Sequence, residues 1–246
     1  MHLWVVLPAF NERDNLPAIL AGLDAMAQTI PGRQLSVLLV DDGSTDGTAA
    51  VAQKSAGHLD LRVLTNSRNL GLAGTIRRGL AAALEEAGRD GVIISMDADN
   101  SHLPVQIPAL LSRLEQGCDV AIASRFQPGA VVHGVPWHRR LLSAGLGRLF
   151  SALYPISGVR DYSCGYRAYR ADRLALALDR RDEPLTDDGF AVMVRLLIAL
   201  HKRGATFGEV PIVLRYDQKL GPSKMRVGRT VMRTLSVLWR ERRSRS

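Results

Sequence analysis

Two carboxylates one residue apart, Asp97 and Asp99, follow an apolar run at residues 92–94. A carboxylate at the edge of a buried segment is costly to desolvate, so this placement needs a compensating partner. Mg²⁺ and Mn²⁺ prefer oxygen ligands, and Mg²⁺ sites commonly combine one or two carboxylates with substrate phosphates. The pair therefore predicts a metal site, although Asp99, Asn100 or Ser101 could instead simply cap the following helix.

A second acidic pair, Asp41 and Asp42, also ends an apolar segment and leads into a turn-forming stretch at residues 43–48. Turn formation and helix capping explain several of these residues but not both carboxylates. An acidic residue at a strand end can bind the N–H groups of a nucleobase or the hydroxyls of a ribose. The earlier segment PAFNE adds an aromatic face, Phe10, and a carboxylate, Glu12, although by itself it could equally start a helix.

Strands and helices are expected to alternate along the first half of the chain. Apolar runs predict strands at residues 2–7, 35–40, 61–64, 92–96 and 119–123. Helical spacing of apolar residues predicts helices at 15–28, 45–56, 72–87 and 103–115. This alternation indicates an α/β fold with a largely parallel sheet, in which ligands bind beyond the carboxyl ends of the strands. The acidic motifs follow strands, so we expect them to meet at that edge.

The second half is less regular. A Gly- and Pro-containing loop is expected at residues 127–136, helices at 137–154 and 188–203, an edge strand at 207–214 interrupted by Pro211, and a basic helix from Met225. We expect one catalytic domain over residues 1–223, with a nucleotide-sugar-binding half at 1–126 and an acceptor-binding half at 127–223. Residues 224–246 would form a basic helix or tail.

The composition favours a globular protein with anionic partners. The 246 residues carry a formal net charge of +8, which suits nucleic acid, phosphorylated small molecules or an anionic membrane surface. The two cysteines, Cys118 and Cys164, are too few and too far apart for a disulfide framework or a metal site, which favours a reducing, cytoplasmic location. No apolar run approaches the roughly 18 residues of a membrane span, and the start lacks signal-peptide features, so membrane contact would be peripheral.

The motifs together carry a resemblance. PAFNE, VDDGSTDGT, Asn69-Leu70-Gly71, MDADNSH and ASRF occur in this order and resemble family 2 glycosyltransferases of the GT-A fold, with a mostly parallel sheet and helices on both faces. Later segments, RRLLS, DYSCGYRAYR, EVPIV and GPSK, resemble the dolichyl- or polyprenyl-phosphate mannose synthases. The resemblance implies an inverting, metal-dependent transfer of a hexose, mannose foremost, from a nucleotide sugar, GDP-mannose foremost, to a polyprenyl phosphate.

The resemblance also implies roles for individual residues. The nucleotide sugar would be bound by members of the first four motifs: Pro8, Phe10, Asn11, Glu12, Asp41, Asp42, Asn69, Gly71, Asp97, Ala98 and Asp99. Mg²⁺ or Mn²⁺ would be held across the diphosphate by Asp97 and Asp99, with Ser101 as a third ligand. Donor and acceptor phosphates would be bound by residues of the later motifs: Arg125, Arg139, Arg140, Arg215, Ser223 and Lys224. Asp97, Asp99 and Arg125 would thereby stabilise the charge that develops on the leaving diphosphate.

A second acceptor class stays open because of Asp187 and Asp188. Relatives often carry an aromatic-x-Phe-Gln-x-Glu segment in the helix after the acceptor region, whereas residues 190–195 read FAVMVR. Asp187 or Asp188 could act as general base for a hydroxyl acceptor, as in other inverting family 2 enzymes. Asp188 is therefore also a candidate catalytic residue.

Two rivals lie outside this family. A basic nucleic-acid-binding protein is compatible with the charge, but aromatic residues make up only 5% of the chain and the acidic loops would repel phosphate unless they bind a metal. A nucleotidyltransferase could share the α/β core and the metal carboxylates, but it would release diphosphate from a nucleoside triphosphate. We expect a nucleotide sugar and a phosphorylated lipid as partners, and no nucleic acid.

The C-terminal tail has the pattern of a basic amphipathic helix. Val227, Val231, Leu235 and Leu238 share one face, and four arginines lie on the others. Such a helix can lie on an anionic membrane, here at its cytoplasmic face. The alternative is a helix packed on the core with solvated arginines.

Overall fold

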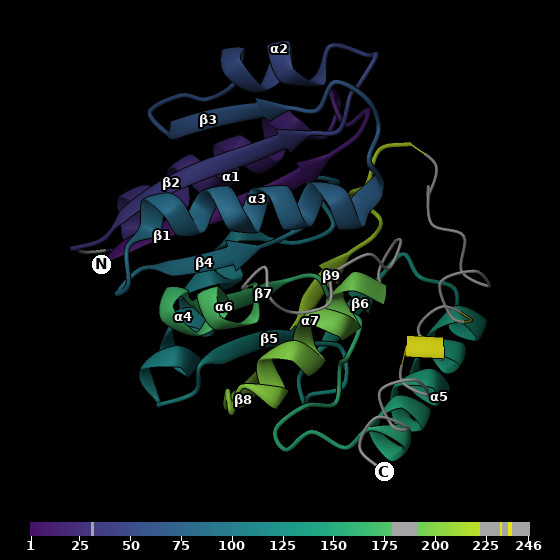
Figure 1. Ribbon diagram of the computed structural model, residues 1–246. Coiled ribbons are helices and arrows are strands. Elements are labelled where there is room, and N and C mark those ends of the chain that lie inside the picture. The colour runs from purple at the N-terminus through teal and green to yellow at the C-terminus, as the bar shows by residue number, and fades with distance from the viewer. Residues whose placement is uncertain (31, 179–190, 222–231, 233–235, 238–246) are drawn as a thin grey trace.

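The computed structural model describes residues 1–30, 32–178, 191–221, 232 and 236–237. Its centre is a seven-stranded sheet of order β3-β2-β1-β4-β7-β5-β8 (Figure 1). The strands are β1 (His2–Ala9), β2 (Gln34–Asp41), β3 (Asp60–Thr65), β4 (Val92–Ser95), β5 (Val120–Ser124), β7 (Arg167–Arg170) and β8 (Phe207–Pro211). Every neighbouring pair in this sheet is parallel except the two pairs that include β7, which is antiparallel to both β4 and β5.

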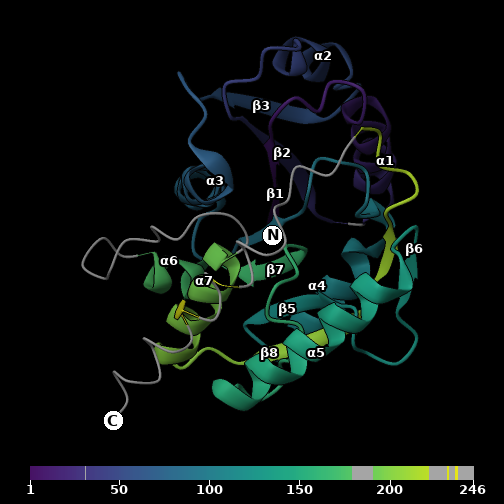
Figure 2. The ribbon, with the colours of Figure 1, turned by 90° about the vertical axis from the view of Figure 1, so that its right-hand side faces the viewer.

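Helices cover both faces of the sheet. They are α1 (Leu16–Thr29), α2 (Thr48–Lys54), α3 (Gly71–Ala87), α4 (Ile107–Glu115) preceded by the 3₁₀ turn η1 (Pro104–Gln106), α5 (Trp137–Leu153), α6 (Ala171–Ala177) and α7 (Ala191–Lys202). Figure 2 shows α3, α6 and α7 on one side of the sheet and α1 and α4 on the other. A small second sheet pairs β6 (Val131–His133) with β9 (Val213–Arg215) in parallel. The α/β fold with a mostly parallel sheet is thus confirmed.

The predicted helix at residues 45–56 was wrong at its start. The helix begins only at Thr48, because the preceding residues form a turn. The Ser44 amide donates to Asp41 Oδ1 (3.0 Å), and the Thr48 amide donates to Asp46 Oδ1 (2.9 Å). Gly47, at the N-cap of α2, has a φ of +88°, which favours glycine. The sequence pattern did not separate this turn from the helix because its Ser, Thr and Asp residues also suit a helix start.

Strand β7 was not predicted. Residues 167–170 form a four-residue strand that runs against its neighbours, so it lies outside the βαβ alternation from which the other strands were read. The expected edge strand at 207–214 is confirmed and ends at Pro211: β8 forms the edge of the main sheet, and β9 belongs to the small one. The division into halves at residue 126 stays a prediction, and the basic C-terminal helix falls largely outside the described residues.

Close packing of α3 against the sheet requires Gly79. A Cβ atom at this position would lie 2.5 Å from Val6 Cγ1 of β1 and 2.9 Å from Val40 Cγ2 of β2. Both valines are fully buried, so the contact cannot be relieved into solvent. Among the described helices none is long and apolar enough to cross a membrane.

The first prediction compares two glycine-to-alanine changes in helices. Alanine normally stabilises a helix interior by about 0.5–1 kcal/mol relative to glycine, and a Cβ atom at Gly145 of α5 would meet no atom within 4 Å apart from its chain neighbours and the backbone of its own helix. We expect Gly145→Ala to raise the free energy of unfolding by about that amount. We expect Gly79→Ala to lower it by about 1–2 kcal/mol, because overpacking outweighs the helix gain. Urea denaturation measures both changes, and equal effects would contradict the packing of α3.

Candidate active site

The loops that follow β1 and β2 are joined by hydrogen bonds through Asn11. Its backbone amide donates to Ser44 Oγ (2.9 Å), and its Oδ1 accepts from the Thr45 amide (2.9 Å). The Glu12 amide donates to Thr48 Oγ1 (3.0 Å). Asn11 has a φ of +52°, a conformation that asparagine tolerates better than most residues. The first two sequence motifs therefore form one structural unit at the carboxyl edge of the sheet.

Asp41 and Asp42 are buried, and their carboxylates organise loops. Asp41 Oδ1 accepts from the Ser44 amide (3.0 Å). The Asp42 carboxylate accepts from three N–H groups, those of Asn66 Nδ2 (2.7 Å), the Leu70 amide (2.7 Å) and the Gly71 amide (2.9 Å). Asn69 Oδ1 also accepts from the Gly71 amide (3.0 Å). These contacts hold the loops after β2 and β3 together, and direct binding of a nucleoside by Asp41, Asp42, Asn69 or Gly71 stays a prediction.

Asp97 and Asp99 lie in the loop after β4 and have different surroundings. Asp99 Oδ1 accepts from the amide (3.1 Å) and the hydroxyl (2.5 Å) of Ser101, and Asp99 Oδ2 pairs with Lys219 Nζ at 2.5 Å. The Asp97 amide donates to His102 Nδ1 at 3.0 Å. Because this nitrogen accepts, the proton of a neutral His102 lies on Nε2, which is 3.9 Å from Asp97 Oδ2. His102 also stacks on Tyr166, with ring centroids 5.0 Å apart.

The charges at this loop are unevenly compensated. Burial raises the pKa of Asp97, and the neighbouring carboxylates of Asp99 and Glu12 raise it further, against the opposing effects of His102 and Lys219. Burial would also raise the pKa of Asp99, but the Lys219 ammonium and the Ser101 hydroxyl hold it below its ordinary value. Burial would lower the pKa of Lys219, but the Asp99 carboxylate raises it above its ordinary value, so Lys219 stands at Asp99 as a cation.

The residues present fit a divalent cation. Asp97, Asp99 and Ser101 offer only oxygen donors, which suit Mg²⁺ or Mn²⁺. The described part of the chain contains no cluster of three or more His, Cys, Asp or Glu side chains with metal-site geometry. Mg²⁺ is commonly bound through one or two carboxylates, with water and substrate phosphates completing the shell, and Asp97 and Asp99 supply two carboxylates.

Arg125, just after β5, is fixed by the fully buried Asp161. Its Nε and Nη2 donate to the two Asp161 oxygens at 2.8 and 2.7 Å, and its amide donates to Oδ2 at 3.1 Å. Burial would raise the pKa of Asp161, but the Arg125 guanidinium holds it below its ordinary value. Glu209 Oε1 in turn accepts from the Asp161 amide (2.7 Å). Burial raises the pKa of nearby Cys164 to about 12, so this thiol stays neutral and suits packing rather than nucleophilic attack.

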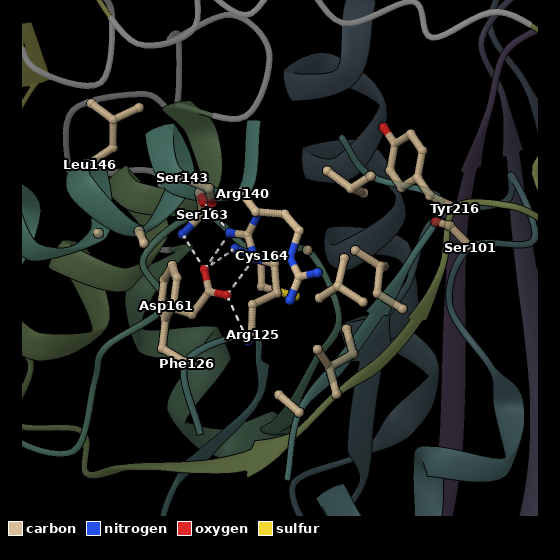
Figure 3. Close-up of a pocket in the computed structure, with 18 of the residues that line it drawn as sticks. Ser101, Arg125, Phe126, Arg140, Ser143, Leu146, Asp161, Ser163, Cys164 and Tyr216 are labelled. Atoms are coloured by element: carbon tan, nitrogen blue, oxygen red, sulfur yellow. Dashed lines mark hydrogen bonds and ion pairs between the residues drawn. The ribbon is translucent and has the colours of Figure 1, made fainter. Parts of the chain in front are cut away.

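A cavity of about 690 Å³ opens beside these residues (Figure 3). Its polar lining includes Asp97, Ser101, His102, Arg125, Arg140 and Tyr216. Its apolar lining includes Phe126, Val132, Val135, Trp137, Leu141, Leu146, Phe150, Ile212 and Leu214. In Figure 3 the hydrogen-bonded group of Arg125, Asp161 and Ser163 lies at the centre, and Ser101 and Tyr216 lie to its right. The cavity therefore combines an ionic region with extensive apolar walls.

The structure brings many, not all, of the predicted site residues together. Asp97, Ser101, Arg125 and Arg140 line one cavity, and Asp99 contacts Ser101. Arg215 pairs with Asp217 (Nη2 to Oδ2, 2.8 Å) and is not among the described residues that line the cavity. Its acceptor role stays a prediction. The Arg139 side chain and residues Asp187, Asp188, Ser223 and Lys224 lie outside what the structure describes.

Four residues of the site were not assigned a role from the sequence. His102 and Asp161 belong to the MDADNSH and DYSCGYRAYR segments, so their position in a motif was a usable signal. Lys219 contacts Asp99 across 120 residues of sequence, and Asn15 contacts Leu220 across 205. Contacts at such separations leave no spacing pattern in a single sequence.

Comparison with known proteins agrees with these observations. The family model described as glycosyl transferase family 2 matches residues 4–175. A polyprenol monophosphomannose synthase from Mycolicibacterium smegmatis is 35% identical over 229 residues, covering 90% of this chain and 80% of the relative. An undecaprenyl-phosphate mannosyltransferase from Micrococcus luteus is 35% identical, covering 93% and 89%. A dolichol-phosphate mannosyltransferase from Pyrococcus furiosus is 30% identical over 98% of this chain, which spans 63% of that protein.

Solved structures show the same fold. Glucosyl-3-phosphoglycerate synthase from Mycobacterium tuberculosis, in complex with Mn²⁺, UDP and phosphoglyceric acid, matches with a TM-score of 0.71 at 21% identity, covering 98% of this chain and 78% of that one. Mannosyl-3-phosphoglycerate synthase from Rubrobacter xylanophilus matches with a TM-score of 0.67 at 18% identity, covering 100% and 75%. At this identity the likeness establishes the GT-A fold and no more.

The second prediction concerns the Arg125–Asp161 pair. Asp161→Asn leaves a largely buried guanidinium without its counter-charge, and breaking a buried pair in this way costs about 3–5 kcal/mol. We expect the free energy of unfolding to fall by about 3 kcal/mol, measured by urea denaturation. The control Ser163→Ala removes one hydrogen bond to Arg125 Nη2 (2.7 Å) and should cost about 1 kcal/mol. An Asp161→Asn effect no larger than that of the control would show that the pair does not stabilise the site.

Proposed function

This chain belongs to glycosyl transferase family 2, and we propose that it transfers mannose from GDP-mannose to a polyprenyl phosphate. The chain is a glycosyltransferase. Three relatives that are 30–35% identical are named as mannosyltransferases or mannose synthases acting with polyprenol, undecaprenyl phosphate or dolichol phosphate. Their names support both the sugar and the acceptor class.

One observation carries the acceptor proposal: the cavity that joins Asp97 and Arg125 to apolar walls. A polyprenyl phosphate has an anionic head and a long hydrocarbon chain, and the lining offers a matching surface to each. Arg125 and Arg140 supply positive charge for the phosphate, and Phe126, Leu146 and Phe150 supply apolar contacts for the first isoprene units. A small hydrophilic acceptor would leave these walls exposed to water.

On the donor side, Phe10 and Glu12 would contact the nucleoside, while Asp97, Asp99 and Ser101 would hold Mg²⁺ or Mn²⁺. When bound, the cation would neutralise negative charge on the diphosphate leaving group. The Lys219 ammonium at Asp99 adds a second positive charge close to the same position. These residues would thereby keep the scissile bond at the mouth of the acceptor cavity.

The reaction would be a single displacement with inversion. An acceptor phosphate oxygen forms a bond to the anomeric carbon while the bond from that carbon to the diphosphate oxygen breaks. A phosphate acceptor is already anionic, so no general base is required. Because Asp161 fixes the Arg125 guanidinium in advance, that cation does not have to reorganise as charge moves from the acceptor to the leaving group.

A described surface also supports peripheral contact with an anionic membrane. Trp137 and Leu141, one turn apart on α5, are 72% and 63% exposed. Arg148, also on α5, is exposed. Apolar and cationic side chains on one helix suit the boundary between headgroups and acyl chains, and both apolar residues also line the cavity that would take the lipid. The basic C-terminal helix stays a further prediction for the same membrane.

The third prediction tests the reaction. With GDP-mannose, Mn²⁺ and a short polyprenyl phosphate, we expect lipid-dependent release of GDP and a lipid whose mass increases by one hexose. Asp99→Ala should lower turnover by about 100-fold or more, the scale expected for losing a preorganised stabiliser of transition-state charge. Asp14→Ala, at a side chain that is 71% exposed, should leave turnover unchanged.

The same assay separates the main alternatives. Chelation of the metal should abolish turnover, and added Mn²⁺ should restore it. UDP-glucose in place of GDP-mannose tests the donor. GDP-mannose hydrolysis that no polyprenyl phosphate accelerates would contradict the lipid acceptor and would direct the search to hydroxyl acceptors.

The fourth prediction tests the membrane surface. The wild-type protein should float with vesicles of phosphatidylcholine and phosphatidylglycerol. The double variant Trp137→Glu/Leu141→Glu should partition at least about tenfold less well, because it loses buried apolar area and gains negative charge. The matched control is Leu176→Glu, at a leucine of α6 that is 45% exposed. Equal partitioning of the double variant and the wild type would contradict a role for α5.

A further inference from the structure

Asn15 stands at the N-cap of α1 but does not use its side chain as a helix cap. Asparagine is among the residues most favoured at an N-cap, because its side-chain oxygen accepts from a free amide of the first turn. Within the described residues, the Asn15 side chain makes no capping hydrogen bond. It is only 3% exposed, so its polar atoms have left water and need partners elsewhere. Because Asn15 does not form the helix cap that asparagine favours, its buried side chain indicates a role other than capping.

The Asn15 amide instead bridges two separate parts of the site. Its Nδ2 donates to Glu12 Oε2 (2.7 Å) and to the Leu220 carbonyl (3.1 Å). Its Oδ1 accepts from the Leu220 amide (2.9 Å). A primary amide has two donor hydrogens and an acceptor oxygen, and here both kinds of group are engaged. Neither a serine nor an aspartate could reproduce this arrangement.

The segment held by Asn15 lies against the proposed metal site. Leu220 follows Lys219, whose Nζ contacts Asp99 Oδ2. The Lys219 ammonium also lies 5.6 Å from the ring centroid of Tyr216, a residue that lines the cavity. Fixing both backbone polar groups of Leu220 therefore restricts where the preceding lysine can reach. The Asn15 contact is thus one residue away from the ammonium group that pairs with Asp99.

We propose that Asn15 is a positioning residue that couples occupancy of the nucleoside site at Glu12 to the placement of residues 216–221, and so of Lys219. This inference rests on the proposed function for the role of Glu12. A ribose hydroxyl bound at Glu12 fixes the same carboxylate that orients the Asn15 amide, and the oriented amide holds Leu220. The coupling is reciprocal, so an ordered 216–221 segment also favours nucleotide binding.

Limited trypsin proteolysis tests the coupling directly, because trypsin cleaves the peptide bond between Lys219 and Leu220. Asn15 binds both the amide and the carbonyl of Leu220, so it should hold this bond away from the protease. Mass spectrometry follows the fragment that starts at Leu220. We expect Asn15→Ser to be cut at this bond about tenfold faster than the wild type, as the loss of two hydrogen bonds to one residue implies. Serine also keeps a good N-cap for α1. Asp14→Ser, at the neighbouring exposed position, should match the wild type.

The coupling itself appears when nucleotide is added. GDP with Mn²⁺ should slow cleavage at Lys219–Leu220 in the wild type and leave the rate in Asn15→Ser nearly unchanged, while calorimetry shows that both proteins bind GDP. Asn15→Asp, which removes both amide donors at constant side-chain size, should behave as the serine variant does. Thermal unfolding of each variant checks that the substitution has not destabilised the whole protein.

Three outcomes would overturn the proposal. Equal cleavage of wild type and Asn15→Ser without nucleotide would show that the Asn15 contact does not hold the segment. Equal protection by GDP in both would show that it does not couple the sites. A wild-type protein that binds neither GDP nor UDP would overturn the coupling together with the proposed donor. GDP binding that protects the Lys219–Leu220 bond equally in the wild type and in Asn15→Ser would overturn the coupling alone.

Discussion

The ion pair between Arg125 and Asp161 is the interaction on which the rest of the site depends. Arg125 directly follows β5, and Asp161 begins the segment that leads into β7, the antiparallel strand between β4 and β5. That segment reaches β4, since Ser95 Oγ donates to the Gly165 carbonyl at 2.7 Å. The pair therefore fixes the cation of the cavity relative to the strand that leads to Asp97 and Asp99. Asp161 is fully buried and accepts three hydrogen bonds from Arg125, which suits a group that must be in place before charge develops.

The other charged side chains of the site lie in two regions, one acidic and one basic. Carboxylates gather after β1, β2 and β4, where the topology places the ends of parallel strands side by side. Arginines gather around the cavity beside α5, among apolar side chains. Lys219 stands between the two groups, in contact with Asp99. A diphosphate with its cation suits the acidic side, and a lipid phosphate suits the cationic and apolar side, so the bond to be exchanged would lie where the two meet.

Much of this arrangement could be predicted from the sequence, for identifiable reasons. The five strands of the βαβ series are recognisable as apolar runs, and the motifs after them reveal Asp97, Asp99 and Arg125. Strand β7 could not be read in this way, since four residues set antiparallel carry no alternating pattern. Nucleoside binding by Asp42 stays a prediction, and its carboxylate also accepts three N–H groups that hold loops, a role that requires knowledge of which loops are neighbours. Lys219 and Asn15 take part in contacts between residues 120 and 205 positions apart in the sequence.

We propose that the donor diphosphate and its cation meet at Asp97 and Asp99, beside the cavity that Asp97 lines. A crystal structure of the protein with GDP and Mn²⁺, with anomalous scattering to locate the manganese, tests this most directly. We expect an anomalous peak from a manganese ion coordinated by both aspartates and by the GDP diphosphate, with the adjoining cavity open beside Arg125. Manganese bound away from these carboxylates, or a diphosphate that does not face the cavity, would contradict it.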